Sequence, residues 1–182
     1  MKITWNKANG LLEWWKVYLL YKKAFPASER KPFAVIFKMA HQKKTDVWCL
    51  HDKSRFVGFA TTINGSEAVL LDYLAVKPAF RGQGVGRAAL GLMGEQYYEK
   101  GLFVEIESPF EPGSDQPMRQ RRKQFYRSCG MEPFGVMANV FGVKMELLGC
   151  GCKLNFEEYH AFYRDNYSQW SADHLSEERY PE

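Results

Sequence analysis

The sequence predicts an α+β fold. Two β-rich segments, residues 47–50 and 55–63, follow each other through a short turn, and an apolar strand over residues 67–76 then leads into a glycine-rich loop and a helix. Strands joined by short turns pair antiparallel, whereas two strands joined through a helix run parallel. The order therefore predicts a mixed central sheet flanked by helices.

Length and composition fit an ordinary globular protein. The chain has 182 residues, of which 46% are hydrophobic and 25% are charged. A net charge of +4 suits an anionic ligand but is too small to indicate nucleic-acid binding. No apolar run is long enough to span a bilayer, and the first residues do not resemble a signal peptide, so we expect a cytoplasmic protein without a membrane partner.

The four cysteines predict reduced thiols and no metal site. They form no disulfide framework in a chain of this length, and the pair Cys150 and Cys152 lacks a second ligand pair at zinc-like spacing.

The N-terminal third is predicted to contain a short strand and two helices. The strand covers residues 2–5, and Asn9 is placed to cap the first helix, whose apolar residues recur at helical spacing. Pro26 interrupts that helix, and residues 28–32 open the second one.

The remaining elements follow from turn and stop signals. Asn64-Gly65 favours a turn into the strand at residues 67–76. Glycines are expected to end two of the helices, and Asn155 with Glu158 predicts the cap of the last one. The predicted order is a helix at 84–100, a strand at 102–108, a helix at 118–129, strands at 134–137 and 143–148, and a final helix after residue 155.

The loop at residues 81–87 indicates a phosphate site. It places three glycines at alternate positions between Arg81 and Arg87, directly before a helix. The first amides of a helix lack partners and carry partial positive charge, and glycines let a ligand approach them closely. Arginines add full charges. The alternative is a glycine-rich turn whose arginines lie in solvent. The loop lacks the lysine of a nucleotide P-loop, and its third glycine comes one place early for a dinucleotide fingerprint.

Two motifs resemble those of one family. The run Arg81-Gly82-Gln83-Gly84-Val85-Gly86, preceded by Leu74-Ala75-Val76, resembles motif A of the GCN5-related N-acetyltransferases, the GNAT family, which binds the pyrophosphate of acetyl-coenzyme A. Phe125-Tyr126, followed by Gly130-Met131, resembles motif B. The resemblance covers about residues 1–149, and residues 25–33 with 119–126 are similar to an uncharacterised bacterial subgroup.

This resemblance implies a GNAT-like fold, with a mixed central sheet in which a parallel pair of strands splays apart around the pantetheine arm of the cofactor. Residues 1–149 are then the acetyltransferase domain, and residues 150–182 are a C-terminal helical extension packed on the same domain. Acetyl-coenzyme A is expected as the acyl donor, bound by Leu74, Ala75, Val76, Arg81, Gly82, Gln83, Gly84, Val85, Gly86 and Arg87.

The activity that the resemblance implies is N-acetyl transfer. The acetyl group would pass directly to a primary amine of a small molecule or a protein in a ternary complex, and homodimers are common in this family. One alternative is a non-catalytic module that binds or senses acyl-coenzyme A. Another is a dinucleotide-binding oxidoreductase.

Two residues are candidates for catalysis. Tyr126 matches the motif B tyrosine near the coenzyme sulfur, so it is expected to donate to the leaving thiolate; the alternative is that it packs the helix on the sheet.

Asp72 interrupts an apolar strand, where an unpaired carboxylate is unfavourable. Because family members often place a carboxylate or histidine there and act through a water, Asp72 is the candidate base. Its alternative is a hydrogen bond to neighbouring backbone or to an arginine.

A pair of glutamates offers a site for the amine. Glu105 and Glu107 are two residues apart on a predicted strand, so both point to one face. Glu107 is the candidate ligand for the ammonium group of the acceptor. The alternative for both is an ion-pair cluster with Arg119, Arg121 or Arg122.

Overall fold

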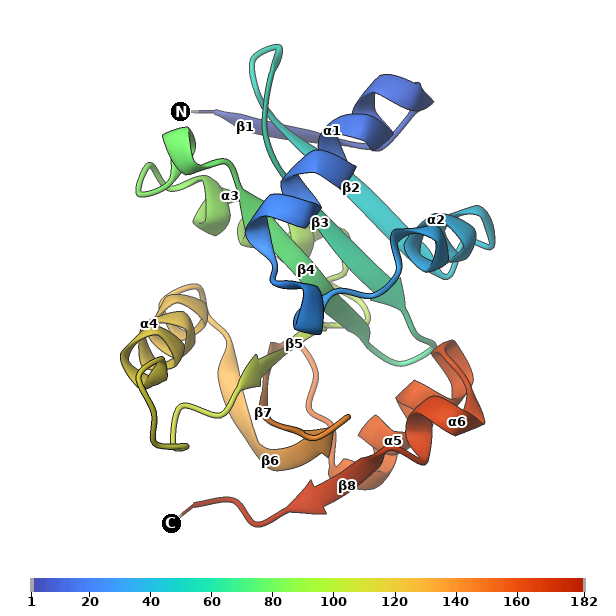
Figure 1. Ribbon diagram of the computed structural model, residues 1–182, viewed down its shortest axis with the longest axis vertical. Coiled ribbons are helices and arrows are strands. Elements are labelled where there is room, and N and C mark those ends of the chain that lie inside the picture. Colours follow the sequence, from blue (N-terminus) through green and yellow to red (C-terminus); the bar gives the residue numbers. More distant parts are fainter. Residues whose placement is uncertain (1, 182) are drawn as a thin grey trace. The chain divides into compact units, whose positions relative to one another are not determined.

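The sheet has the predicted mixed architecture. A computed structural model describes residues 2–181 (Figure 1). Among these residues the strands follow the order β1-β2-β3-β4-β5-β7-β6-β8 in one sheet. β4 and β5 are its parallel pair, and helices flank it, which confirms the α+β prediction. The predicted splaying of this pair stays a prediction. Within the same residues, no helix combines the length and apolarity needed to cross a membrane.

The chain divides into two compact units. The first contains the residues up to Asn64 together with Leu71–Met93, and the second contains Gly65–Leu70 and the residues from Gly94 onward. This division reflects local compactness and does not test where a domain ends. The domain boundary predicted at residue 149 therefore stays a prediction.

The first unit is an antiparallel sheet with helices packed on it. β2 pairs antiparallel with both β1 and β3. Its core joins α1 residues such as Leu20 and Tyr21 to Ile36 of α2, Phe59 of β3 and Tyr73 of β4. The elements are β1 (Ile3–Lys7), α1 (Gly10–Ala24), the 3-10 helix η1 (Ala27–Glu29), α2 (Phe33–His41), β2 (Thr45–Asp52), β3 (Arg55–Asn64), most of β4 (Val69–Val76), the 3-10 helix η2 (Pro78–Phe80) and most of α3 (Val85–Gln96).

The second unit is built around β7, which pairs antiparallel with β5 and β6. Phe103 of β5 contacts the rings of Tyr159 and Phe162, with ring centroids 6.4 and 5.1 Å apart, so α5 is anchored to the sheet. β8 extends the sheet by pairing with β6. The elements are β5 (Leu102–Glu107), α4 (Gln116–Arg127), β6 (Glu132–Val140), β7 (Val143–Cys150), α5 (Phe156–Asn166), α6 (Gln169–Ala172) and β8 (Leu175–Glu178).

Candidate functional site

The end of β4 is held close to β3. The Lys77 amide donates to the Val57 carbonyl at 2.8 Å, so contact with β3 continues past the last residue of β4. Gly58 permits this approach, because a Cβ atom there would lie 2.5 Å from the Ala75 carbonyl oxygen. The backbone of Leu74–Val76 is therefore fixed next to the start of the glycine-rich loop.

Two glycines and two side-chain hydrogen bonds fix the conformation of the loop. Gly82 and Gly84 have φ angles of +71° and +80°, in the left-handed region that other residues adopt only with strain. Arg81 Nε donates to the Val76 carbonyl at 3.1 Å, and Gln83 Nε2 donates to the Ala79 carbonyl at 2.8 Å. These bonds tie the exposed loop to the end of β4 and to η2.

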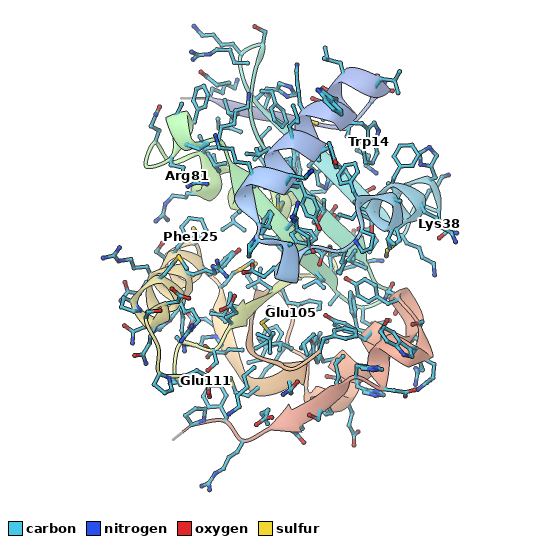
Figure 2. All side chains as sticks on the ribbon, viewed as in Figure 1. Trp14, Lys38, Arg81, Glu105, Glu111 and Phe125 are labelled. Atoms are coloured by element: carbon cyan, nitrogen blue, oxygen red, sulfur yellow. The ribbon has the colours of Figure 1, made fainter. Side chains whose placement is uncertain are left out.

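The loop presents a row of backbone amides at the start of α3. α3 begins at Val85, and its first backbone bond beyond the loop runs from the Ala88 amide to the Gly84 carbonyl at 2.9 Å. Within residues 2–181, the amides of residues 82–86 donate no backbone hydrogen bond of good geometry. Arg81 lies at this loop, before the helix (Figure 2). A helix N-terminus with free amides and nearby arginines can bind a phosphate or diphosphate.

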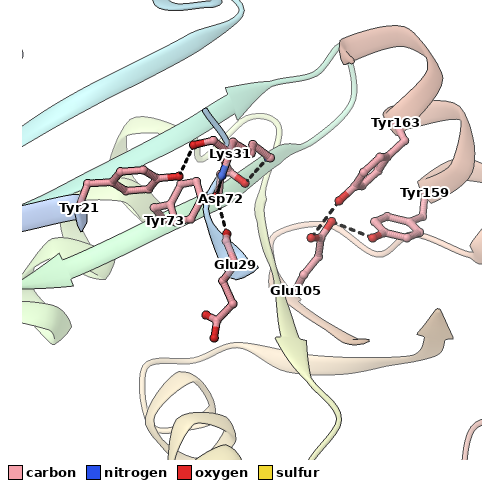
Figure 3. A network of polar contacts seen from close by, with 8 residues as sticks. All are labelled: Tyr21, Glu29, Lys31, Asp72, Tyr73, Glu105, Tyr159 and Tyr163. Carbon is pink, nitrogen blue, oxygen red and sulfur yellow. Dashed lines mark hydrogen bonds and ion pairs between the residues drawn. The ribbon is translucent and has the colours of Figure 1, made fainter. Parts of the chain in front are cut away.

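Asp72 lies on β4 and forms an ion pair (Figure 3). Its side chain is 9% exposed, and Oδ1 lies 2.7 Å from Lys31 Nζ. The next residue, Tyr73, points to the opposite face, donates to the Glu29 carbonyl at 3.0 Å and accepts from the Lys31 amide at 3.2 Å. Burial, reinforced by the Asp72 charge, raises the pKa of Tyr73. Lys31 is 41 residues away in the chain and was not among the expected partners.

Tyr126 lies near the end of α4. Its side chain is half-buried, and burial raises the pKa of Tyr126 to about 12, although the Arg122 charge opposes this rise. Among the residues described, no group forms a hydrogen bond with its hydroxyl. At neutral pH the hydroxyl is therefore protonated and can donate a hydrogen bond to an anion.

The two glutamates of β5 have different surroundings. Glu107 lies 4.0 Å from both Arg119 Nη1 and Arg122 Nη1 of α4, which matches the ion-pair alternative at long range. Glu105 accepts hydrogen bonds from Tyr159 Oη at 2.8 Å and Tyr163 Oη at 3.1 Å (Figure 3). These tyrosine partners were not predicted, because the strand pattern gives the face of a residue but not the element that covers it.

The predicted site residues fall into two groups. Asp72, the backbone of Leu74–Val76 and the loop at residues 81–87 belong to the first unit, where β4 and the start of α3 hold them together. Tyr126 and Glu107 belong to the second unit. In the part of the chain that the structure describes, no group of three or more histidine, cysteine or carboxylate side chains could hold a metal ion.

Comparison with known proteins gives a consistent result. The sequence model of the acetyltransferase (GNAT) domain matches residues 43–133, a segment that includes β4, the loop and Tyr126. No curated protein sequence matches the chain.

Solved structures resemble the fold over most of its length. A protein described as an acetyltransferase of the GNAT family from Bacteroides thetaiotaomicron has a TM-score of 0.70 at 18% identity, covering 94% of this chain and 99% of that one. An aminoglycoside 6'-N-acetyltransferase complexed with coenzyme A has a TM-score of 0.66 at 14% identity, covering 82% and 96%. A Bacillus subtilis acetyltransferase in complex with coenzyme A has a TM-score of 0.59 at 12% identity, covering 85% and 100%.

Proposed function

The chain belongs to the GNAT acetyltransferase family, and from this we propose that it transfers the acetyl group of acetyl-coenzyme A directly to a primary amine in a ternary complex. The observation that carries the proposal is the row of amides at residues 82–86, which donate no hydrogen bond of good geometry among the described residues and open a helix between two arginines. Two structures of similar fold were solved with coenzyme A.

Binding of the donor follows from the first unit. The amides of residues 82–86 bind the diphosphate, and Arg81 and Arg87 add charge. Arg81 Nε donates to the Val76 carbonyl, so the two terminal nitrogens of the Arg81 guanidinium group bind the diphosphate. The pantetheine arm extends along the backbone of Leu74–Val76.

The transfer requires two proton movements. A lysine-like ammonium has a pKa of about 10.4 and must lose a proton before its nitrogen can attack the thioester carbon. Asp72 takes that proton, directly or through a water. As the new C–N bond forms, the C–S bond breaks, and the coenzyme thiolate receives a hydrogen bond and then a proton from the Tyr126 hydroxyl. The attacking nitrogen loses its second proton as the amide forms, and this proton passes through water to restore the Tyr126 hydroxyl. Glu107 is retained as a ligand for the ammonium group, although its two arginines favour the ion-pair alternative.

Titration calorimetry with acetyl-coenzyme A tests the proposal directly. We expect saturable binding with one molecule per chain, and release of free coenzyme A when a primary amine is added. Lack of binding at millimolar acetyl-coenzyme A would refute the proposed function.

A further inference from the structure

A cavity in the first unit has cationic and aromatic walls. It measures about 280 Å³ and lies at the C-terminal half of α1, η1 and the start of α2. Three of its side chains are cationic, and three are aromatic; they are Lys22, Arg30, Lys31, Tyr18, Tyr21 and Phe33. None of the described residues that line it is acidic. A cavity of this size fits a small ligand or one end of a larger one.

The segment that carries two of the cations is held rigidly. Tyr21 Oη donates to the Lys31 carbonyl at 2.9 Å, and Tyr73 Oη donates to the Glu29 carbonyl at 3.0 Å (Figure 3). The carbonyl groups on both sides of Arg30 are thus fixed before any ligand arrives. Such preorganisation lowers the entropy lost on binding.

Two of the cations lack an anionic partner within the described part of the chain. The Nε atom of Arg30 is buried and has no acceptor among residues 2–181. The Lys22 ammonium lies 5.4 Å from the centre of the Tyr18 ring, and in the same part of the chain it has no carboxylate partner. Burial raises the pKa of Tyr21, so this wall carries no negative charge at neutral pH. A buried donor needs an acceptor, and the charge of the cavity favours an anionic one.

The third cation connects the cavity to the candidate base. Lys31 lines the cavity, and its ammonium group lies 2.7 Å from Asp72 Oδ1. An anion in the cavity would compete with Asp72 for this ammonium group and leave the carboxylate more able to accept a proton.

We propose that this cavity binds a carboxylate or phosphate carried by the acceptor, so that the acetylated amine is a small molecule with both an amino group and an anionic group. The proposal rests on the function proposed above and names its substrate class. Arg30 provides a bidentate contact for the anion, and Lys22 and Lys31 provide charge. The aromatic walls accommodate an apolar part of the same molecule.

Matched pairs of amines test this proposal. We expect kcat/KM for tyrosine to exceed that for tyramine, or kcat/KM for phosphoethanolamine to exceed that for ethanolamine, by roughly tenfold or more. The first pair tests a carboxylate and the second tests a phosphate. Equal values within both pairs, or no acetylation of any of the four amines while acetyl-coenzyme A binds, would overturn the inference and leave the family activity in place. Absence of acetyl-coenzyme A binding would refute the proposed function itself.

Charge variants test whether the preference for anionic amines arises in this cavity. Lys22→Gln should raise KM for the preferred anionic amine several-fold and leave KM for its neutral counterpart unchanged. Lys23→Gln is the matched control, because Lys23 is the exposed neighbour on α1 and does not line the cavity. Arg30→Lys keeps the charge but loses the bidentate contact, so it should give an intermediate effect. If Lys22→Gln and Lys23→Gln change the two amines alike, the cavity is not the anion site.

Discussion

At the scale of single residues, the Tyr126 hydroxyl has the properties expected of a proton donor. It is protonated at neutral pH, because the ordinary pKa of a tyrosine is about 10 and burial raises that of Tyr126 further to about 12, and no described residue accepts its proton. A thiolate is a much stronger acceptor than a thioester sulfur. The hydrogen bond from Tyr126 therefore stabilises the departing group more than the ground state, which is the condition for faster catalysis.

We predict that Tyr126→Phe lowers kcat by about 100-fold, the usual contribution of one general acid, and leaves the Kd for acetyl-coenzyme A nearly unchanged. Steady-state kinetics and titration calorimetry measure the two quantities. Tyr98→Phe is the control, because Tyr98 is 83% exposed. Unchanged kcat in Tyr126→Phe would leave only a packing role for this tyrosine.

Asp72 presents a choice between a base and a structural ion pair. Its carboxylate is nearly buried and bonded to Lys31, an arrangement that fits either role. We predict that Asp72→Asn lowers kcat by roughly 100-fold at neutral pH, and that part of the loss is recovered as the pH approaches the pKa of the free amine.

The comparison variant is Asp165→Asn, which changes an exposed carboxylate paired with its neighbour Arg164. A structural role for Asp72 would give a different result: Asp72→Asn would lower the urea midpoint while the folded enzyme kept its kcat.

At the scale of elements, the glycines around α3 have opposite roles. Gly82 and Gly84 need positive φ angles in the loop, whereas Gly91 lies inside the helix, where an added Cβ would meet no atom within 4 Å. A methyl group at residue 84 therefore strains the amides that bind the diphosphate, while one at residue 91 removes only the flexibility of glycine.

We predict that Gly84→Ala weakens acetyl-coenzyme A binding by about tenfold and destabilises the fold by about 1 kcal/mol. Gly91→Ala should stabilise the protein by roughly 0.5–1 kcal/mol without affecting binding. Calorimetry and urea denaturation report the two effects. Equal affinities of the two variants would contradict the role assigned to the loop.

Local signals predicted elements well where they act within a few residues. Asn155 and Glu158 form the expected capping box at the start of α5. Asn9 lies at the predicted N-cap of α1, but its side chain makes no capping bond; the Asn9 amide donates to the Glu13 carboxylate at 2.8 Å. α2 begins only after Pro32, since a proline disfavours helix in the residue before it.

Partners that are distant in the sequence could not be predicted. The strand pattern placed Asp72 and Glu105 correctly as polar residues on strands, yet Lys31 is 41 residues from Asp72 and Tyr159 is 54 residues from Glu105. A period-two pattern identifies the face of a strand, and the element that packs on that face depends on the tertiary fold. The short elements α6 and β8, four residues each, carried no signal of sufficient length.

At the scale of the whole molecule, burial of weak acids makes stability depend on alkaline pH. Burial raises the pKa of Cys49 to about 12 and that of Cys152 to about 11. It also raises the pKa of Tyr73 and, together with the Glu105 charge, raises that of Tyr159 well above its ordinary value. In the unfolded chain these groups titrate near their ordinary values of about 8.5 for cysteine and about 10 for tyrosine.

The folded protein therefore holds more protons than the unfolded chain once the pH exceeds about 8.5. Stability from these groups is fully present below that pH and decreases as the pH rises, because the unfolded chain loses its protons first. We predict that the free energy of unfolding is flat with respect to these groups from about pH 7 to 8 and falls steadily above about pH 9. Urea denaturation across this range, in the presence of a reductant, measures the slope.

Tyr159→Phe should reduce the slope above about pH 10, whereas Tyr98→Phe, which changes an exposed tyrosine, should leave it as in the parent protein. A free energy of unfolding that stays constant up to about pH 10.5 would show that these side chains are not protected from water in the folded protein.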